Sequence, residues 1–423
     1  MRAAGKPPLS PFRRFFSNLG PGLITGAADD DPSGISTYSV AGATFGYLPL
    51  WTAVVSFPLM AAVQLMCARL GMITGLGLAG VIRRRYSRRV LWVACTLLVV
   101  ANVINIAADL GGMAEATAMV TGAPVALSVP VFGIAMVVSL MWSSYRSLAR
   151  IFKWLTLVLL AYVVTAFVAR ADWRTAFHLT LVPHVEWSRS FFSVLVAILG
   201  TTISPYLFFW QAAQEVEEER AKGRNLSRRR GATRAELAAC RMDVVAGMFA
   251  SNAIMYFIIL TTAATLHAHG QTSISTAQEA AEALRPLAGA GAYALFTVGL
   301  IGTGMLAVPV LAGSCAYAIA EAAAWRGSLN QRPDRAKKFY VVLGVAMALG
   351  VALTYTGLNA IRLLFAAAVL NGVLAPPLIL IVLLLTRDRQ VMGDATNSRV
   401  LGFLGWTAFA VMVVAALGLF VAQ

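Results

Sequence analysis

Three consecutive carboxylates, Asp29, Asp30 and Asp31, stand inside a stretch that otherwise has the composition of an apolar helix. The small and apolar residues GPGLITGA precede them, and the apolar run TYSVAGATFGYLPLWTAVV follows soon afterwards. Pro32 breaks a helix because its nitrogen carries no hydrogen. A break frees backbone carbonyl and amide groups, which can bind an ion beside the acids. The stretch therefore predicts an ion site built on an interrupted helix.

A second apolar segment is interrupted in a similar way. Residues 199–209, LGTTISPYLFF, place Pro205 after a group of hydroxyl side chains. We therefore take Pro32 and Pro205 as two helix breaks. Irregular backbone at membrane depth is tolerated where it lines a cavity, so both breaks are candidate walls of one site.

The composition requires that these segments lie in a membrane. The chain has 423 residues, of which 59% are hydrophobic and 13% are charged, and its mean hydropathy is +0.73. Soluble domains carry about 25% charged residues. The net charge of +15 could indicate nucleic-acid binding, but cations that set topology in loops explain it better. The four cysteines have no CxxC spacing, so no metal cluster or disulfide framework is expected.

Eleven segments reach the length of about 20 apolar residues that spans a bilayer. They are 19–45, 48–70, 90–121, 127–145, 151–170, 189–214, 238–266, 287–322, 338–356, 359–386 and 399–421. The first and the sixth contain the breaks. These two segments lie five apart. Because five crossings, an odd number, end on the opposite side of the membrane, the second set of five begins there and is inverted relative to the first. Two facing broken helices in an inverted repeat place the substrate near the middle of the membrane.

Positive charges mark every second connection. The basic positions are Arg13 and Arg14; Arg83, Arg84, Arg85, Arg88 and Arg89; Arg146 and Arg150; Lys222, Arg224, Arg228, Arg229 and Arg230; Arg332, Arg335, Lys337 and Lys338; and Arg387 and Arg389. The positive-inside rule then places the N-terminus in the cytoplasm and the C-terminus outside. We expect an integral protein of a bacterial inner membrane.

The predicted organisation has six parts. They are a cytoplasmic tail (1–18), a first five-helix repeat (19–170), an outer connection (171–188), a second, inverted repeat (189–386), a cytoplasmic loop (387–398) and a terminal helix (399–423).

Several stretches resemble the Nramp-type metal transporters over nearly the whole chain. They are GPGLITGAADDDPSG, ARLGMITGLGLA, TTISPYLFFWQ, CRMDVVAGMFASNAIM and NGVLAPPLILIVLLLTRDRQVMG. The resemblance implies an all-α LeuT-type fold with two inverted five-helix repeats, one extra helix and helices 1 and 6 broken. It also implies transport of a divalent metal coupled to protons.

The family's metal ligands are an Asp, an Asn, a Met sulfur and a backbone carbonyl near an Ala. The matching positions here are, in that order, Asp31, Gly34, Ser204 and Thr201. The family's two histidines fall at Tyr206 and Gln211. Of three acids in its third helix, one is kept at Asp109, and the others map to Asn102 and Gly112. The site has therefore lost the sulfur ligand that favours transition metals.

These replacements lead us to predict a small oxyanion, with bicarbonate as the first candidate. Hydroxyl groups and half-helix N–H groups would donate hydrogen bonds to it. The predicted substrate site comprises Asp31, Ser33, Gly34, Thr201, Thr202, Ser204 and Tyr206. A co-transported proton or cation would be held by Asp29, Asp30, Asp31 or Asp109.

The alternative substrate is a hard divalent cation such as Mg²⁺, bound through Asp31 and retained water molecules. Mn²⁺ and Fe²⁺ are less favoured because the sulfur is missing. Under either prediction the chain is a transporter and not an enzyme, since no stretch typical of an intramembrane protease occurs. We expect no cofactor and no nucleic-acid partner. The partners are a small inorganic ion and the lipid bilayer.

Overall fold

The computed structural model describes residues 20–142, 157–221 and 232–422, in which every regular element is a helix. The long helices are α4 (Trp51–Thr74), α6 (Arg88–Thr121), α7 (Val125–Trp142), α13 (Arg234–Thr265), α16 (Ala292–Ala322), α17 (Lys337–Thr354), α18 (Ala360–Arg387) and α20 (Arg399–Val421). Two interrupted pairs are α2 (Pro21–Asp29) with α3 (Pro32–Phe45), and α11 (Arg189–Thr202) with α12 (Pro205–Ala221).

The remaining helices are short and connect the long ones. They are α5 (Leu78–Arg85), α9 (Leu160–Val168), α10 (Trp173–Leu181), α14 (Ala277–Ala281), α15 (Arg285–Ala288) and α19 (Arg389–Met392), with the 3-10 helices η1 (Leu48–Leu50), η2 (Leu157–Leu159), η3 (His267–His269), η4 (Glu282–Leu284) and η5 (Gly289–Gly291).

Each of the eleven predicted segments coincides with one or more of these helices. Nine helices in the described ranges are long and apolar enough to cross a membrane. The first predicted segment is missing from that count because it is divided into α2 and α3. The fifth is described only from Leu157 onward. The basic residues of 1–18, of 143–156 and of 222–231 lie outside the described residues.

Both interruptions follow from local chemistry. Helix α2 ends at Asp29, Asp30 has left the helical region, and Asp31 is extended and caps α3, with Pro32 at its first position. Helix α11 ends at Thr202, and Pro205 begins α12. Proline is favoured at the first position of a helix, where its missing N–H has no partner to lose. The prediction of two broken helices is confirmed.

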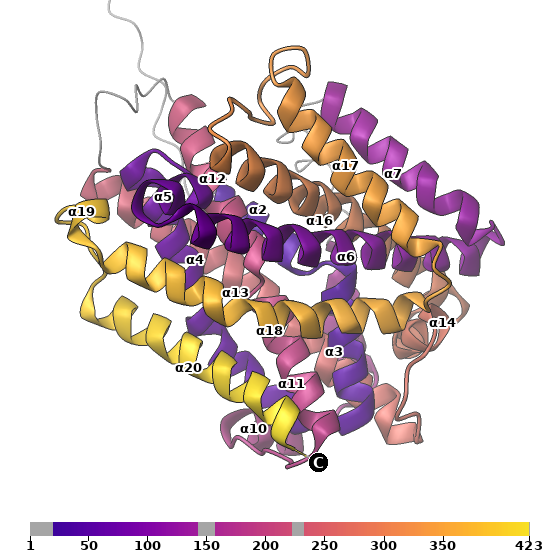
Figure 1. The fold of residues 1–423 in the computed structure, drawn as a ribbon. Coiled ribbons are helices and arrows are strands. Elements are labelled where there is room, and N and C mark those ends of the chain that lie inside the picture. The colour runs from indigo at the N-terminus through magenta and orange to yellow at the C-terminus, as the bar shows by residue number, and fades with distance from the viewer. Residues whose placement is uncertain (1–19, 143–156, 222–231, 423) are drawn as a thin grey trace, which may run out of the picture.

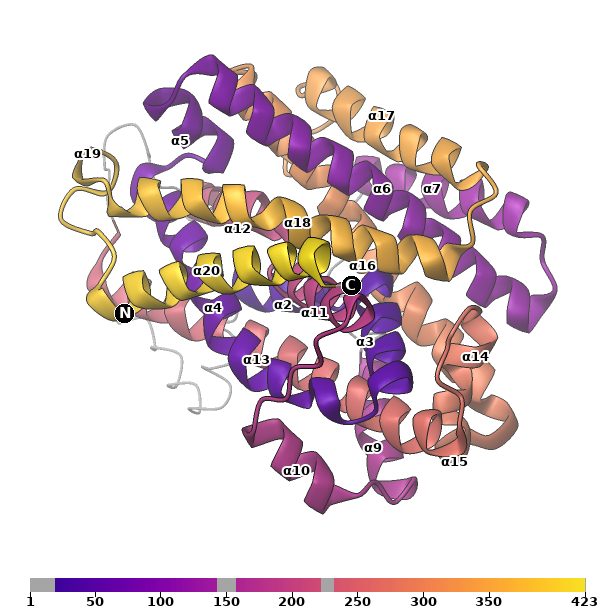
Figure 2. The same ribbon diagram turned by 60° about the horizontal axis from the view of Figure 1, so that its bottom comes forward.

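The broken helices lie inside the bundle. In Figures 1 and 2, α2, α3 and α11 run through the interior, while α7 and α17 lie side by side along one margin and α20 lies beside α18. A side chain of α13 holds the start of helix α2 in place. The Asp243 carboxylate on α13 accepts hydrogen bonds from the backbone nitrogens of Gly20 at 2.7 Å and Gly22 at 2.6 Å. A carboxylate at this point also balances the positive end of the α2 dipole.

Helices α2 and α13 approach each other with no side chain between them. A Cβ atom on Gly26 would overlap the backbone of Gly247, and one on Gly247 would overlap Gly22. We expect Gly26→Ala to lower the free energy of unfolding by about 1–3 kcal/mol, the usual cost of overpacking. Thermal unfolding of the purified protein measures this. Gly402→Ala on α20 is the matched control, since its Cβ meets no atom within 4 Å. Equal stability of the two variants would contradict the close contact.

Candidate functional site

Asp31 stands at the centre of the first break. Its Oδ1 accepts hydrogen bonds from the Ser33 hydroxyl at 2.6 Å and from the Gly34 backbone nitrogen at 2.7 Å. Its Oδ2 accepts a hydrogen bond from the Asn105 amide of α6 at 2.9 Å. The residue is 2% exposed. Asp31 therefore caps α3 and also joins the break to α6.

Tyr206 brings the second break to the first. Its hydroxyl donates to the Ala28 carbonyl, in the last turn of α2, at 2.9 Å. That bond satisfies one of the carbonyls that the end of a helix leaves free. The Tyr206 carbonyl in turn accepts a hydrogen bond from Ser314 of α16 at 3.1 Å. The two interruptions therefore face each other, and α16 holds the second one in place.

The hydroxyl groups of the second break point their hydrogens into their own helix. Thr201 and Thr202 both donate to the Ile198 carbonyl at 2.9 Å. Ser204 donates to the carbonyls of Gly200 and Thr201, at 2.7 and 2.6 Å. A hydroxyl has a single hydrogen and two acceptor lone pairs. What these groups can offer to a ligand is therefore acceptor oxygen, which suits a cation, and not the N–H or O–H donors that an anion requires.

Asp29 and Asp30 face α13 and not Asp31. The Ser251 hydroxyl lies 2.7 Å from Oδ2 of Asp29 and 3.2 Å from Oδ1 of Asp30. The second oxygen of Asp29 is buried and has no hydrogen-bond partner. The backbone leaves the helical conformation at Asp30 and is extended at Asp31, so the three acids do not point to one place. The structure thus places Asp31 between the first break and α6, and Asp29 and Asp30 beside α13.

Asp109 lies on α6, one helical turn after Asn105. It is fully buried, and neither of its oxygens accepts a well-formed hydrogen bond. None of the four acids Asp29, Asp30, Asp31 and Asp109 is in an ion pair with a described lysine, arginine or histidine. Buried charge without compensation is costly, so this cluster requires cations or protons.

No group of three or more His, Cys, Asp or Glu side chains converges on one point in the described part of the chain. A cation at the break would therefore be held by one carboxylate together with neutral oxygens and water. That donor set fits a hard divalent ion, which binds through one or two carboxylates and keeps several water molecules.

Two residues of this site were missed by the sequence analysis. Asn105 holds Asp31, and its own side-chain oxygen is buried without a partner. Ser251 joins Asp29 to Asp30 from α13. The spacing of Asn102, Asn105 and Asp109, three and four residues apart, places them on one helix face and could have revealed Asn105. The contact of Ser251 with Asp29 and Asp30 could not be predicted from the sequence, because Ser251 is more than 200 residues away from them.

Helices α2 and α12 are also linked by a side-chain hydrogen bond away from the breaks. Thr25 donates to the Gln211 side-chain oxygen at 2.5 Å. The Gln211 amide donates to Glu215 at 2.9 Å. Since Thr25 is on α2 and Gln211 on α12, the first of these bonds joins the two half-helices, and the second holds the Gln211 side chain from within α12.

The chain is similar to known proteins over nearly its whole length. The model of the family "Natural resistance-associated macrophage protein-like" (Nramp) matches residues 22–422. A protein of Yersinia enterocolitica named "Divalent metal cation transporter MntH" is 26% identical over 416 residues, which cover 96% of this chain and 94% of that protein. A crystal structure of the Eremococcus coleocola manganese transporter superposes with a TM-score of 0.76 at 21% identity, over 98% of this chain and 88% of that one. MhsT, crystallised with L-phenylalanine, superposes with a TM-score of 0.61 at 14% identity, over 94% of this chain and 98% of its own.

These similarities confirm the predicted fold, and they overturn the predicted substrate. The expectation of bicarbonate was wrong: the matching full-length relatives are named divalent metal cation transporters. The physical reason lies in the hydroxyl groups. Thr201, Thr202 and Ser204 were counted as donors by residue type, but their hydrogens are bound by carbonyls of α11.

Proposed function

Because the chain belongs to the Nramp family, a family of polytopic membrane transporters, we propose that it carries a divalent metal cation across the membrane. It acts as a transporter and not as an enzyme. The ion binds where the break at Asp31 faces the break at Ser204. The observation that carries this proposal is the buried carboxylate of Asp31 at the first break, which has no ion pair with a described basic residue.

The ligands follow from the oxygens that remain available. Asp31 supplies the negative charge, and the unpartnered oxygen of Asn105 supplies a neutral carboxamide ligand beside it. Asn105 thereby takes over the chemistry that Gly34 cannot provide. The hydroxyl oxygen of Ser204 and bound water complete an all-oxygen shell. Carboxylate, carbonyl and water ligands suit Mg²⁺, Ca²⁺ and Mn²⁺, whereas soft metals prefer sulfur.

We infer the orientation from the positions of the basic connections. Helix α5, with Arg83, Arg84 and Arg85, and helix α19, with Arg389, lie toward the same end of the bundle (Figure 1). By the positive-inside rule that end is cytoplasmic. A bacterial inner membrane, with the N-terminus inside and the C-terminus outside, is the setting that fits these charges. Coupling to protons through Asp29, Asp30 or Asp109 stays a prediction.

Uptake into proteoliposomes tests the function. Purified protein in sealed vesicles should accumulate Mg²⁺, Mn²⁺ or Ca²⁺ above protein-free vesicles, and each ion should compete with the others. Entry of none of these ions under an imposed gradient, in either direction, would refute the proposal.

The all-oxygen site predicts weak binding of Cd²⁺, a soft ion. Ser204→Cys places a sulfur at the second break with little change in size, and it should increase competition by Cd²⁺ against Mg²⁺ uptake about tenfold. Ser128→Cys is the control, because Ser128 is a buried serine on the peripheral helix α7. Inhibition by Cd²⁺ that is unchanged in Ser204→Cys, or equally increased in the control, would place the ion elsewhere.

A further inference from the structure

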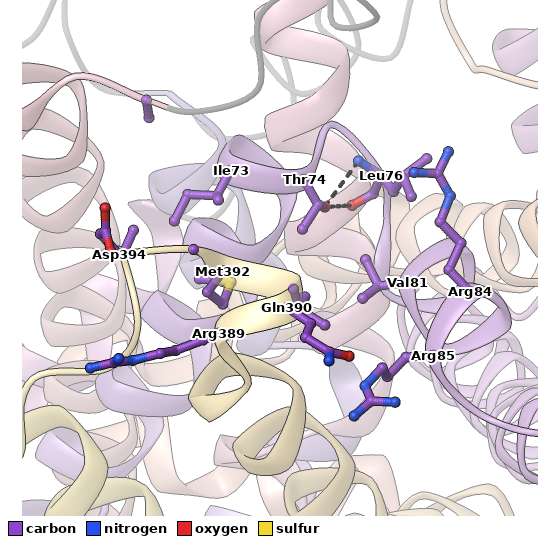
Figure 3. A pocket seen from close by; sticks show the side chains of 14 residues that line it. Ile73, Thr74, Leu76, Val81, Arg84, Arg85, Arg389, Gln390, Met392 and Asp394 are labelled. Carbon is purple, nitrogen blue, oxygen red and sulfur yellow. Dashed lines mark hydrogen bonds between the residues drawn. The ribbon is translucent and has the colours of Figure 1, made fainter.

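A cavity of about 580 Å³ lies apart from the two breaks, among the end of α4, helix α5 and the loop that carries α19 (Figure 3). Apolar side chains such as Ile73, Val81 and Met392 line it together with polar and charged ones. The size is within the range of about 300–1,000 Å³ that small-molecule sites occupy. The elements that form it were predicted to be cytoplasmic connections, whose cations were explained by topology alone.

More positive than negative side chains line this cavity. Its lining includes three arginines, Arg84, Arg85 and Arg389, and a single carboxylate, that of Asp394. Figure 3 shows Arg84 and Arg85 on one side, and Arg389 and Asp394 on the other. The lining as a whole therefore carries an excess of positive charge, with two arginines on the α5 side and an arginine together with a carboxylate on the α19 side.

One of the three arginines is already compensated. The Nε atom of Arg85 lies 2.5 Å from Oδ2 of Asp388, and this hydrogen bond lowers the pKa of the Asp388 carboxyl. Arg84 and Arg389 are exposed and have no ion pair within the described residues. These two guanidinium groups are thus free to bind an anion.

The wall that contains α19 is held in place. Arg69 of α4 donates to the carbonyls of Ala395 at 2.8 Å and Thr396 at 3.2 Å. The Asn397 amide donates to the Thr386 hydroxyl at 2.8 Å. A site that is already formed loses less conformational entropy when it binds a ligand.

The cavity lies where three long helices begin or end, because α6 follows α5 along the chain, and α18 and α20 flank α19. Within two turns of these ends each helix exposes a large apolar side chain: Val93 at 59%, Leu384 at 42% and Phe403 at 69%. In a protein that spans a membrane, such side chains contact acyl chains. An anion bound at the arginines would therefore lie at headgroup depth beside acyl chains.

We propose that this cavity binds the phosphodiester headgroup of an anionic phospholipid. A planar guanidinium group, such as that of Arg84 or Arg389, matches phosphate oxygens in charge and geometry. Basic pockets at the cytoplasmic ends of membrane helices bind such headgroups. The apolar side chains in the lining and those exposed on α6, α18 and α20 favour a lipid over free phosphate as the ligand. The proposal is independent of the ion that is transported.

The test is thermal unfolding of the full-length protein in detergent. Short-chain phosphatidylglycerol should raise the unfolding temperature, while phosphatidylcholine of the same chain length and inorganic phosphate should not. The double variant Arg84→Gln/Arg389→Gln should weaken the apparent affinity for phosphatidylglycerol about tenfold or more. Arg332→Gln/Arg335→Gln removes the same charge from exposed residues of another connection and should leave it unchanged. Asp394→Asn should strengthen binding, because it removes the one acid that lines the cavity.

Other results would overturn the proposal. Stabilisation by inorganic phosphate equal to that by phosphatidylglycerol would identify a site for a free anion. Equal losses in both double variants would mean that lipid binds to general surface charge. If the Arg84/Arg389 double variant does not fold, Asp394→Asn decides alone, and an affinity that is unchanged or weaker contradicts the site.

Discussion

Asp31→Asn is expected to abolish uptake of divalent cations. Asparagine keeps the size of the side chain, and it is as good an N-cap as aspartate, so α3 should still form. What is lost is the one negative charge at the centre of the break. We expect binding to weaken about 100-fold or more, which corresponds to about 2.8 kcal/mol.

Binding and transport have to be measured separately for this variant. Calorimetry with Mg²⁺ and Mn²⁺ reports the affinity, and proteoliposome uptake reports the flux. Asp334→Asn is the matched control, since Asp334 is exposed in the connection before α17 and should behave as the parent. If Asp31→Asn binds the ion as tightly as the parent, the carboxylate is not a ligand, and the site has to be sought at Asp29 and Asp30.

The sequence was sufficient for the fold because the relevant signals are local. Runs of about 20 apolar residues predict spans, and Pro32 and Pro205 each mark a point where a helix must restart. The inverted relation of the two breaks followed from counting segments. None of these steps required knowing which side chains meet.

The substrate could not be predicted in the same way, because it depends on where hydrogens point. Thr201, Thr202 and Ser204 have the same composition whether they donate to a ligand or to their own helix. Only the coordinates show that the carbonyls of Ile198, Gly200 and Thr201 accept those hydrogens. A residue type therefore gives the possible roles of a side chain, and the backbone around it selects one.

The acids show a further limit. Their burial was predicted, but the division between Asp31, which faces α6, and the pair Asp29 and Asp30, which faces Ser251 on α13, depends on packing. Contacts between residues more than 200 positions apart leave no trace in a single sequence. Asn105 differs, since its spacing from Asp109 placed it on the same face of one helix.

Asn105 is the residue whose replacement should next most strongly affect the site. Asn105→Ala removes both the amide that donates to Asp31 and the free oxygen beside it. We expect the KM for divalent cation uptake to rise at least tenfold. The reason is that a lost hydrogen bond to a charged group costs about 1.5–3 kcal/mol, and a ligand oxygen is lost as well.

A control separates this effect from general loss of packing. Asn252 is a buried asparagine on α13 whose amide donates to the Ala53 carbonyl at 2.6 Å. Asn252→Ala should therefore lower the unfolding temperature and leave the KM of the folded protein unchanged. A rise in KM of the same size in both variants would show that Asn105 contributes packing and not ion binding.

Asn105→Asp distinguishes the two roles of the side chain. Aspartate cannot donate to Asp31, but it offers the ion an oxygen and a second charge. If the Asn105 oxygen is a ligand, this variant should bind Mg²⁺ at least as tightly as the parent and release it more slowly, so that kcat falls while KM does not rise. If Asn105 acts only by orienting Asp31, Asn105→Asp should fail as Asn105→Ala does, because the amide donor is absent in both. The ratio of the two KM values therefore decides whether the carboxamide ligand has moved from the first helix to α6.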